Sequence, residues 1–119
     1  MKTNPVVVFV SNDEKSQAVM TDNQMLVFRA DTLRDALAQI VFSYPDVIVI
    51  DASDDMLRAE DVYFHLRSIE HPPVLILSDV PARWDTQYVD NVRVLPQGSD
   101  MMSVIAEINS LLGRQRTVA

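Results

Sequence analysis

The sequence has no cysteine, no long apolar run and few basic residues. The lack of cysteine excludes disulfide bonds, thiolate metal sites and cysteine nucleophiles. The longest apolar run near the N-terminus, residues 5–10, is too short for a signal-peptide core or a membrane span, so we expect a cytoplasmic protein that does not enter a membrane. The 17 acidic residues outnumber the 10 basic ones, and a net charge of −7 argues against binding to nucleic acid.

The composition is that of one folded domain. The 119 residues are enough for one hydrophobic core and too few for two. A hydrophobic share of 48% with 23% charged residues is ordinary for a globular protein and argues against a disordered or coiled-coil chain. We therefore expect one domain over residues 1–113, followed by a polar tail or linker stub over residues 114–119.

Five short runs rich in aliphatic and β-branched residues divide the sequence. These runs are continuously apolar, which indicates strands covered on both faces, as in a parallel sheet. The predicted strands are residues 6–10, 25–28, 47–50, 74–77 and 92–95.

The segments between these runs have the spacing of amphipathic helices. Over residues 33–41 the apolar positions fall at i, i+3, i+4, i+7 and i+8, which predicts a helix with one apolar face. Thr32 is placed to cap its start, with Asp35 three residues later, as in a capping box. The predicted apolar face consists of Leu33, Ala36, Leu37, Ile40 and Val41.

The last predicted helix, over residues 101–112, repeats this pattern. Its expected cap is Ser99 or Asp100, and Gly113 is expected to end it. The other predicted helices are residues 13–22, 59–70 and 81–87. Strands and helices thus alternate along the chain, which predicts an α/β fold with right-handed crossovers and helices on both faces of a parallel sheet.

Polar residues follow several of the predicted strands. Ligands of a doubly wound sheet bind beyond the carboxyl ends of its strands, so these positions are the candidate site. They are Ser11, Asn12 and Asp13 after the first strand, Asp51 after the third, Ser78 after the fourth, and Leu95 with Pro96 at the end of the fifth. The sequence has an aspartate, a hydroxyl and a proline at these points, together with this order of elements and this length. In these features it resembles response-regulator receiver domains over nearly the whole chain.

The resemblance implies a flavodoxin-like (βα)5 fold with strand order 2-1-3-4-5. It also implies that Asp51 stands at the phosphoacceptor position and Ser78 at the position of the conserved hydroxyl. In the family, two acidic residues after the first strand hold Mg²⁺, and a lysine directly before the proline contacts the phosphoryl group.

Most of the other residues that this chemistry needs are replaced in the sequence. Ser11 and Asn12 stand where the acidic pair belongs, and neutral oxygens bind a hard cation weakly. Leu95 replaces the lysine, and an aliphatic side chain cannot pair with a phosphoryl group. Val92 stands where the family carries an aromatic residue that rotates inward on activation. Pro96 remains, and the resemblance implies a cis peptide bond before it.

Two alternatives would keep a cation near the pocket. Asp13 can form a Mg²⁺ site with Asp51 if the first strand ends later than expected. Asp54 and Asp55 can form a displaced metal site with Asp51, although we prefer the interpretation that one of them caps a helix. We expect no metal and no cofactor.

The resemblance also implies a dimerisation surface made by the predicted helix 81–87, the strand 92–95 and the last helix. The candidate interface residues are Trp84, Val92, Met101 and Met102. Trp84 is either an aromatic residue that covers the core or an anchor for a partner. Met101 and Met102 are adjacent on a helix, so one of them must face outward.

Three functional hypotheses follow. The first is a non-enzymatic pseudo-receiver that binds a protein partner or a second copy without phosphorylation, as part of a larger regulator or of a pilus-assembly ATPase. The second is a receiver that a histidine kinase phosphorylates on Asp51 with Mg²⁺. The third is a flavin binder, but residues 11–16 contain no glycine and two acidic residues that would repel the flavin phosphate.

Overall fold

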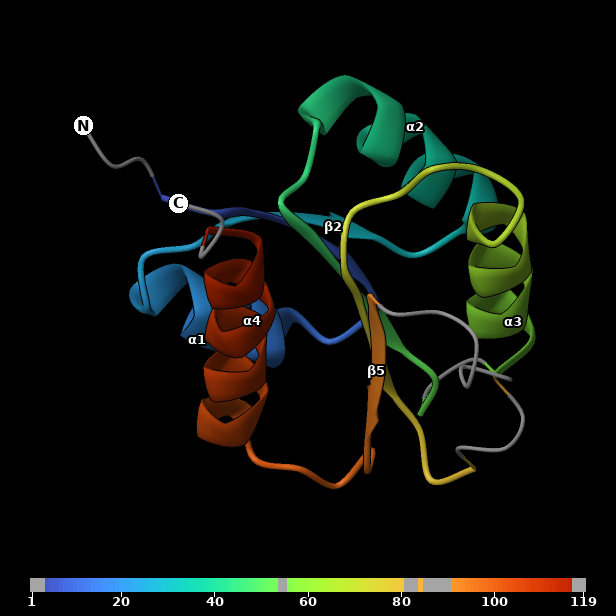
Figure 1. The fold of residues 1–119 in the computed structure, drawn as a ribbon. Coiled ribbons are helices and arrows are strands. Elements are labelled where there is room, and N and C mark those ends of the chain that lie inside the picture. Colours follow the sequence, from blue (N-terminus) through green and yellow to red (C-terminus); the bar gives the residue numbers. More distant parts are fainter. Residues whose placement is uncertain (1–3, 54–55, 81–83, 85–90, 117–119) are drawn as a thin grey trace.

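The protein folds as a five-stranded parallel sheet between two layers of helices (Figure 1). The computed structural model describes residues 4–53, 56–80, 84 and 91–116. The strand order is β2-β1-β3-β4-β5, which confirms the predicted doubly wound, flavodoxin-like sheet. The strands are β1 (Val6–Val10), β2 (Leu26–Ala30), β3 (Val47–Asp51), β4 (Val74–Leu77) and β5 (Val92–Leu95).

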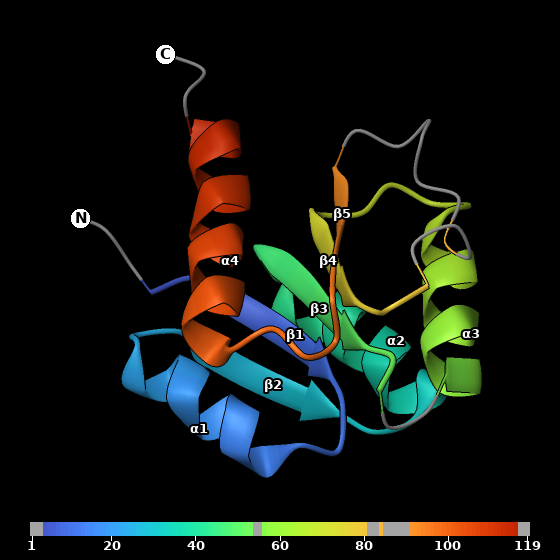
Figure 2. The same ribbon diagram turned by 90° about the horizontal axis from the view of Figure 1, so that it is seen from below.

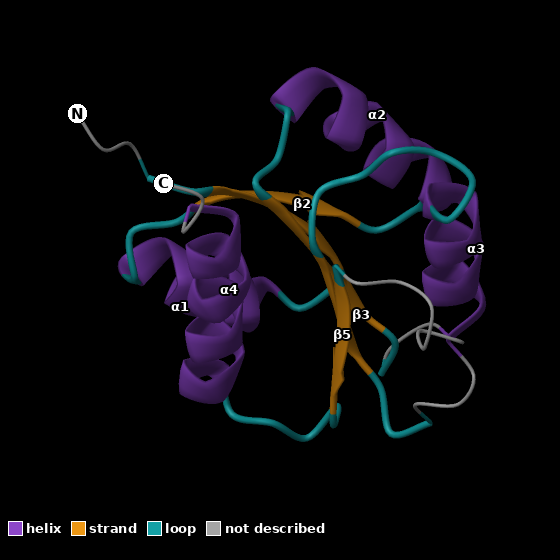
Figure 3. Ribbon diagram, in the orientation of Figure 1, coloured by secondary structure: helices purple, strands orange, loops and turns teal. Residues whose placement is uncertain are grey.

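The helices cover both faces of the sheet. Figure 3 shows the strands between one layer formed by α1 and α4 and another formed by α2 and α3, and Figure 2 shows the same arrangement from below. The described helices are α1 (Glu14–Asp22), α2 (Leu33–Ser43), α3 (Met56–Leu66) and α4 (Met101–Arg116). The helix predicted over residues 81–87 lies outside the described residues except for Trp84. In the described part of the chain, no helix combines the length and apolarity needed to cross a bilayer.

Alternate residues of the central strands point into two separate hydrophobic cores. In β1, Val8 and Val10 pack towards α2 and α3, whereas Val7 and Phe9 pack towards α1 and α4. All residues of β3 and β4 are buried. Burial on both faces explains why these strands read as continuous apolar runs.

Side chains cap three helices at their first turns. The Thr32 hydroxyl accepts a hydrogen bond from the Asp35 backbone N–H at 3.0 Å, as predicted for α2. Asp100, one of the two residues predicted to cap α4, accepts from the Ser103 N–H at 2.9 Å. Asp13 caps α1 in the same way. Each cap satisfies a backbone donor that has no partner within the helix.

Three helix predictions are wrong in detail. The third helix was expected over residues 59–70 but spans Met56–Leu66. After it, the Ser68 and Ile69 N–H groups bond to carbonyl oxygens three residues back, as in a tight turn. Gly113 does not end α4, which continues to Arg116. Val41 was expected in the core but is 65% exposed, since it lies about 100° around α2 from Ile40, which does pack on the core.

Candidate functional site

The carboxyl ends of β1, β3 and β4 bring three buried polar residues to one edge of the sheet. Ser11 and Ser78 are fully buried, and Asp51 is 7% exposed. Asp51 is the last residue of β3 and pairs in register with Leu77 of β4. Ser11 directly follows β1, the neighbour of β3 on its other side. The sheet therefore assembles three of the positions predicted for the site.

Neutral donors surround the Asp51 carboxylate. The Ser11 hydroxyl donates to Asp51 Oδ2 at 3.0 Å. Oδ1 accepts from the Ser53 backbone N–H at 2.9 Å and also from the Ser53 hydroxyl. A buried carboxylate needs such donors because burial without them is costly. Sequence analysis missed Ser53, although a hydroxyl two residues after an aspartate is a common turn pattern.

Arg29 holds the loop after β1 in place. Its guanidinium donates to the Ser11 carbonyl oxygen at 3.3 Å and to the Gln17 side chain at 3.2 Å, and it lies 3.5 Å from the Glu14 carboxylate. The Asp13 backbone N–H donates to the Ser11 hydroxyl at 3.0 Å, so this hydroxyl links the loop to Asp51. Arg29 could not be predicted as part of the site, because it lies in β2, 18 positions along the sequence from the Ser11 carbonyl that it contacts.

The Asp13 carboxylate caps the N-terminus of α1. Its Oδ1 accepts from the N–H groups of Lys15 and Ser16 at 3.0 and 3.2 Å, and its Oδ2 accepts from the Ser16 hydroxyl at 2.6 Å. The Ser16 hydroxyl is the largest cause that lowers the pKa of Asp13 below its ordinary value, and the two backbone donors and Lys15 add to it. Asp13 is thus ionised at neutral pH and engaged in capping the helix.

This donor set does not fit Mg²⁺. The ion prefers an octahedral shell of oxygen ligands, usually with more than one carboxylate or phosphate among them. Here both oxygens of Asp51 accept hydrogen bonds from serines, and both oxygens of Asp13 accept from α1. Among the described residues, no group of three acidic or histidine side chains is placed to hold a metal. Asp54 and Asp55, the alternative ligands or caps, lie outside the described residues.

The side of the site formed by β4 and β5 lacks a cation at the predicted lysine position. Leu95 is partly buried and packs on the core beneath α1 and α4. The Ser78 hydroxyl accepts from the Val80 N–H at 3.1 Å, a local hydrogen bond within the loop after β4. The peptide bond between Leu95 and Pro96 is trans, so the cis bond that the resemblance implied is wrong. Asp79, which we did not predict, accepts from the Gln97 N–H at 3.1 Å and ties the two loops together.

The candidate interface residues differ in their exposure. Trp84 is fully buried and packs edge-on against Tyr63 with ring centroids 5.6 Å apart, so it belongs to the core and is not a surface anchor. Val92 is buried beside it in the same cluster. Met101 is partly buried and Met102 is 60% exposed, as the adjacent helical positions required.

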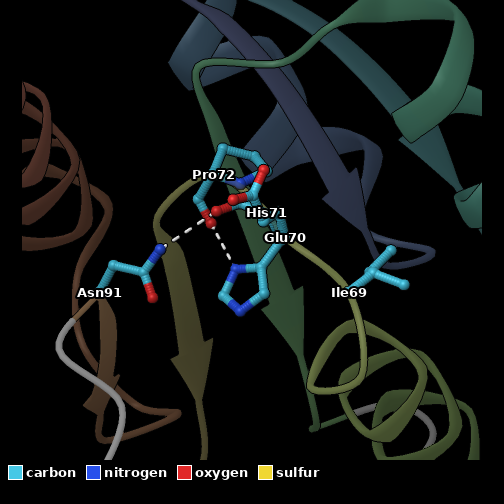
Figure 4. Close-up of a pocket in the computed structure, with 5 residues that line it drawn as sticks. All are labelled: Ile69, Glu70, His71, Pro72 and Asn91. Atoms are coloured by element: carbon cyan, nitrogen blue, oxygen red, sulfur yellow. Dashed lines mark hydrogen bonds between the residues drawn. The ribbon is translucent and has the colours of Figure 1, made fainter.

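A pocket lies at the opposite end of the sheet, before β4 and β5 (Figure 4). It is an open hollow of about 560 Å³. His71 Nδ1 lies 2.7 Å from the Pro72 carbonyl oxygen, and Asn91 donates to the His71 carbonyl oxygen at 3.1 Å. These bonds order the loop backbone, which agrees with a structural role for His71. The lining residues are Ile69, Glu70, His71, Pro72 and Asn91.

Comparison with known proteins gives matches among solved structures only. No protein-family model matches the chain, and no curated protein matches it by sequence. The receiver domain of Francisella response regulator 1452 is 24% identical, with a TM-score of 0.77, and the match covers 94% of this chain and 99% of that one. A receiver domain from Bermanella marisrubri is 20% identical with a TM-score of 0.75, covering 92% and 99% of the two chains. The Vibrio cholerae chemotaxis response regulator CheY4 is 17% identical with a TM-score of 0.74 and the same coverage. At these identities the likeness is one of architecture, and the chain has the fold of response-regulator receiver domains.

Proposed function

We propose that the chain is a pseudo-receiver, a signalling module that acts by binding a protein and does not depend on phosphorylation. The observation that carries this proposal is the state of Asp51, whose two carboxylate oxygens already accept hydrogen bonds from Ser11 and Ser53. These donors are neutral, whereas a phosphoacceptor needs a nearby cation to offset the charge of the incoming phosphoryl group.

The neighbouring positions support the same proposal. Ser11 and Asn12 offer neutral oxygens where the family carries two carboxylates, and Leu95 packs in the core where the family carries a lysine. Without that lysine, a phosphoryl group on Asp51 has no ammonium partner at this position to couple it to the loop after β5.

The proposed activity is recognition, with no enzymatic step and no cofactor. Its surface is the one formed by β5 and α4, to which Met102 contributes an exposed apolar side chain. Arg93 of β5 lies 3.5 Å from Glu107 of α4, so these two elements present one joint surface. We propose that this surface binds an effector protein or a second copy, that nucleic acid and membrane are not partners, and that the module works in the cytoplasm.

The alternative is a working receiver, phosphorylated on Asp51 by a histidine kinase with Mg²⁺. The observation in its favour is that an aspartate stands at the end of β3, in the receiver fold, within a site closed by hydroxyl groups. Asp13 would then have to leave the cap of α1 to bind the ion.

Intact-mass spectrometry after treatment with acetyl phosphate and Mg²⁺ separates the two hypotheses. We expect no added phosphoryl group on the native chain, as for the Asp51→Asn variant. Stoichiometric modification of the native chain that is absent from Asp51→Asn would overturn the proposal. Light scattering over a range of concentrations then tests self-association, and Met102→Glu should weaken any dimer because it buries a charge in the contact.

A further inference from the structure

The end of α2 carries apolar side chains that the fold leaves uncovered. Val41, Phe42 and Tyr44 are 65%, 79% and 84% exposed. Single exposed apolar residues are normal on a protein surface, but here three lie within four positions and two of them are aromatic. In Figure 1 this end of α2 lies on the side of the helix away from α3, at the periphery of the molecule.

Leu26 extends this patch from the edge strand. It is 52% exposed and begins β2, and its N–H donates to the Pro5 carbonyl oxygen at 2.9 Å. The next residue, Val6, exchanges hydrogen bonds with Asp46, two positions after Tyr44. The start of β2 and the end of α2 therefore meet at the same edge of the molecule. We call Leu26, Val41, Phe42 and Tyr44 the α2-end patch.

The backbone of Tyr44 gives an independent sign that its side chain matters. Tyr44 ends α2 in the left-handed conformation, with φ 49° and ψ 61°. Glycine or asparagine usually occupies this position because a bulky side chain is unfavourable there. Tyr44 is nevertheless 84% exposed, so neither backbone preference nor core packing accounts for a tyrosine at this position.

The charged residues of the segment that carries most of the patch are all acidic. Residues 35–57 contain no lysine or arginine, and the exposed Asp46 carboxylate lies two residues from Tyr44. The whole chain carries a net charge of −7. A partner with lysine or arginine beside its apolar residues therefore complements this surface, and an acidic partner does not.

We propose that the α2-end patch docks a cationic amphipathic segment of another protein, with Phe42 and Tyr44 as its aromatic anchors. A second copy of this chain fits the patch poorly, because two molecules of charge −7 repel each other and because four side chains fall short of the roughly 800 Å² that each partner of a stable dimer buries. A short amphipathic helix, in contrast, can dock through contacts with only a few side chains.

Two-dimensional amide NMR tests this proposal with two synthetic peptides as probes. One is an amphipathic helix of leucine and lysine, and the other replaces each lysine by glutamate. We expect the lysine peptide to shift amide signals at the α2-end patch and the glutamate peptide to leave them unchanged. Shifts centred on β5 and α4, or equal shifts with both peptides, would overturn the proposal.

Three variants sharpen the test. Phe42→Ser should weaken binding of the lysine peptide about tenfold or more, as for an aromatic hot spot, whereas Met102→Ser on α4 should not change it. Tyr44→Gly relieves the left-handed backbone, so it should weaken binding without lowering thermal stability. Unchanged affinity in Phe42→Ser and Tyr44→Gly would exclude the proposed anchors.

The NMR experiment can also reveal self-association through the α2-end patch. Signals of the α2-end patch that move with protein concentration in the absence of peptide would show that a second copy is the occupant, against the proposal. The helix α2 and the helix α4 cover opposite faces of the sheet (Figure 3). Binding or no binding at the α2-end patch therefore neither supports nor contradicts the proposed function, which is tested at the surface of β5 and α4.

Discussion

The hydroxyl of Ser11 donates a hydrogen bond to the carboxylate of Asp51, 40 positions away in the sequence, at 3.0 Å. The bond joins the ends of β1 and β3 inside the sheet edge, where Ser11 is fully buried. In the receiver family the first of these positions carries an acidic residue. Under the proposed function, an internal hydrogen bond stands here in place of the receiver family's cation site.

Ser11→Ala should therefore destabilise the fold. The change leaves Asp51 Oδ2 without the Ser11 hydroxyl as a donor and removes the acceptor of the Asp13 N–H. A buried polar group left unsatisfied costs about 1–3 kcal/mol. Urea unfolding measures the difference. The control is Ser110→Ala on the exposed face of α4, which should change stability by about 0.5 kcal/mol or less. Equal midpoints for the two variants would contradict the role given to Ser11.

Restoring the family residues should restore the chemistry. We expect the variant Ser11→Asp, Asn12→Asp, Leu95→Lys to gain Mg²⁺-dependent modification by acetyl phosphate, because two carboxylates supply oxygen ligands and the lysine supplies a cation. Intact-mass spectrometry detects the added phosphoryl group. The same three changes combined with Asp51→Asn provide the negative control, because this variant lacks the acceptor carboxylate. If the folded triple variant stays unmodified, the residue types at these positions are not what prevents phosphorylation.

The strands could be predicted from the sequence because the central strands are buried on both faces. Residues such as Ile48 and Val49 face different cores, so no polar residue interrupts the run. Asp51, Ser11 and Ser78 could be predicted as neighbours for a related reason, since the ends of parallel strands meet at one edge.

Side-chain contacts that depend on the packing of elements distant in the sequence could not be predicted. Trp84 stands in a short predicted helix with a poor apolar pattern, and its burial depends on packing against Tyr63 of α3. Leu95 could be placed at the position of the receiver family's lysine from the sequence, but the direction of its side chain follows from the sheet register. The exposure of Val41 depends on how wide a face of α2 the core covers, which the helical period alone does not determine.

Asp13→Ala should weaken the start of α1 by about 1 kcal/mol at neutral pH, the usual loss for an N-cap. The folded-state pKa of Asp13 is lowered, chiefly by the Ser16 hydroxyl. Its ionic contribution is thus fully present above the ordinary carboxyl pKa and is lost as the pH falls through the lower folded-state pKa. The stability gap between native chain and variant should narrow over that acid range.

Urea unfolding at neutral and acid pH measures this gap, with Asp13→Asn as the matched control. Asparagine caps a helix about as well as aspartate but does not ionise, so Asp13→Asn should keep most of the stability and differ from the native chain mainly in its pH dependence. A gap between native chain and Asp13→Ala that is constant from neutral to acid pH would contradict the ionised cap.

Gly113→Ala should stabilise the protein, since Gly113 lies inside α4 without a left-handed backbone. An added Cβ meets no atom within 4 Å, and alanine is favoured over glycine in a helix interior by up to about 1 kcal/mol. Circular dichroism should show a melting temperature a few degrees higher. Gly98→Ala in the turn after β5 also meets open space but gains no helix, so it serves as the control. If Gly113 ended the helix in the left-handed conformation, as its sequence position suggested, the alanine variant would instead melt lower, because a Cβ is unfavourable in that conformation.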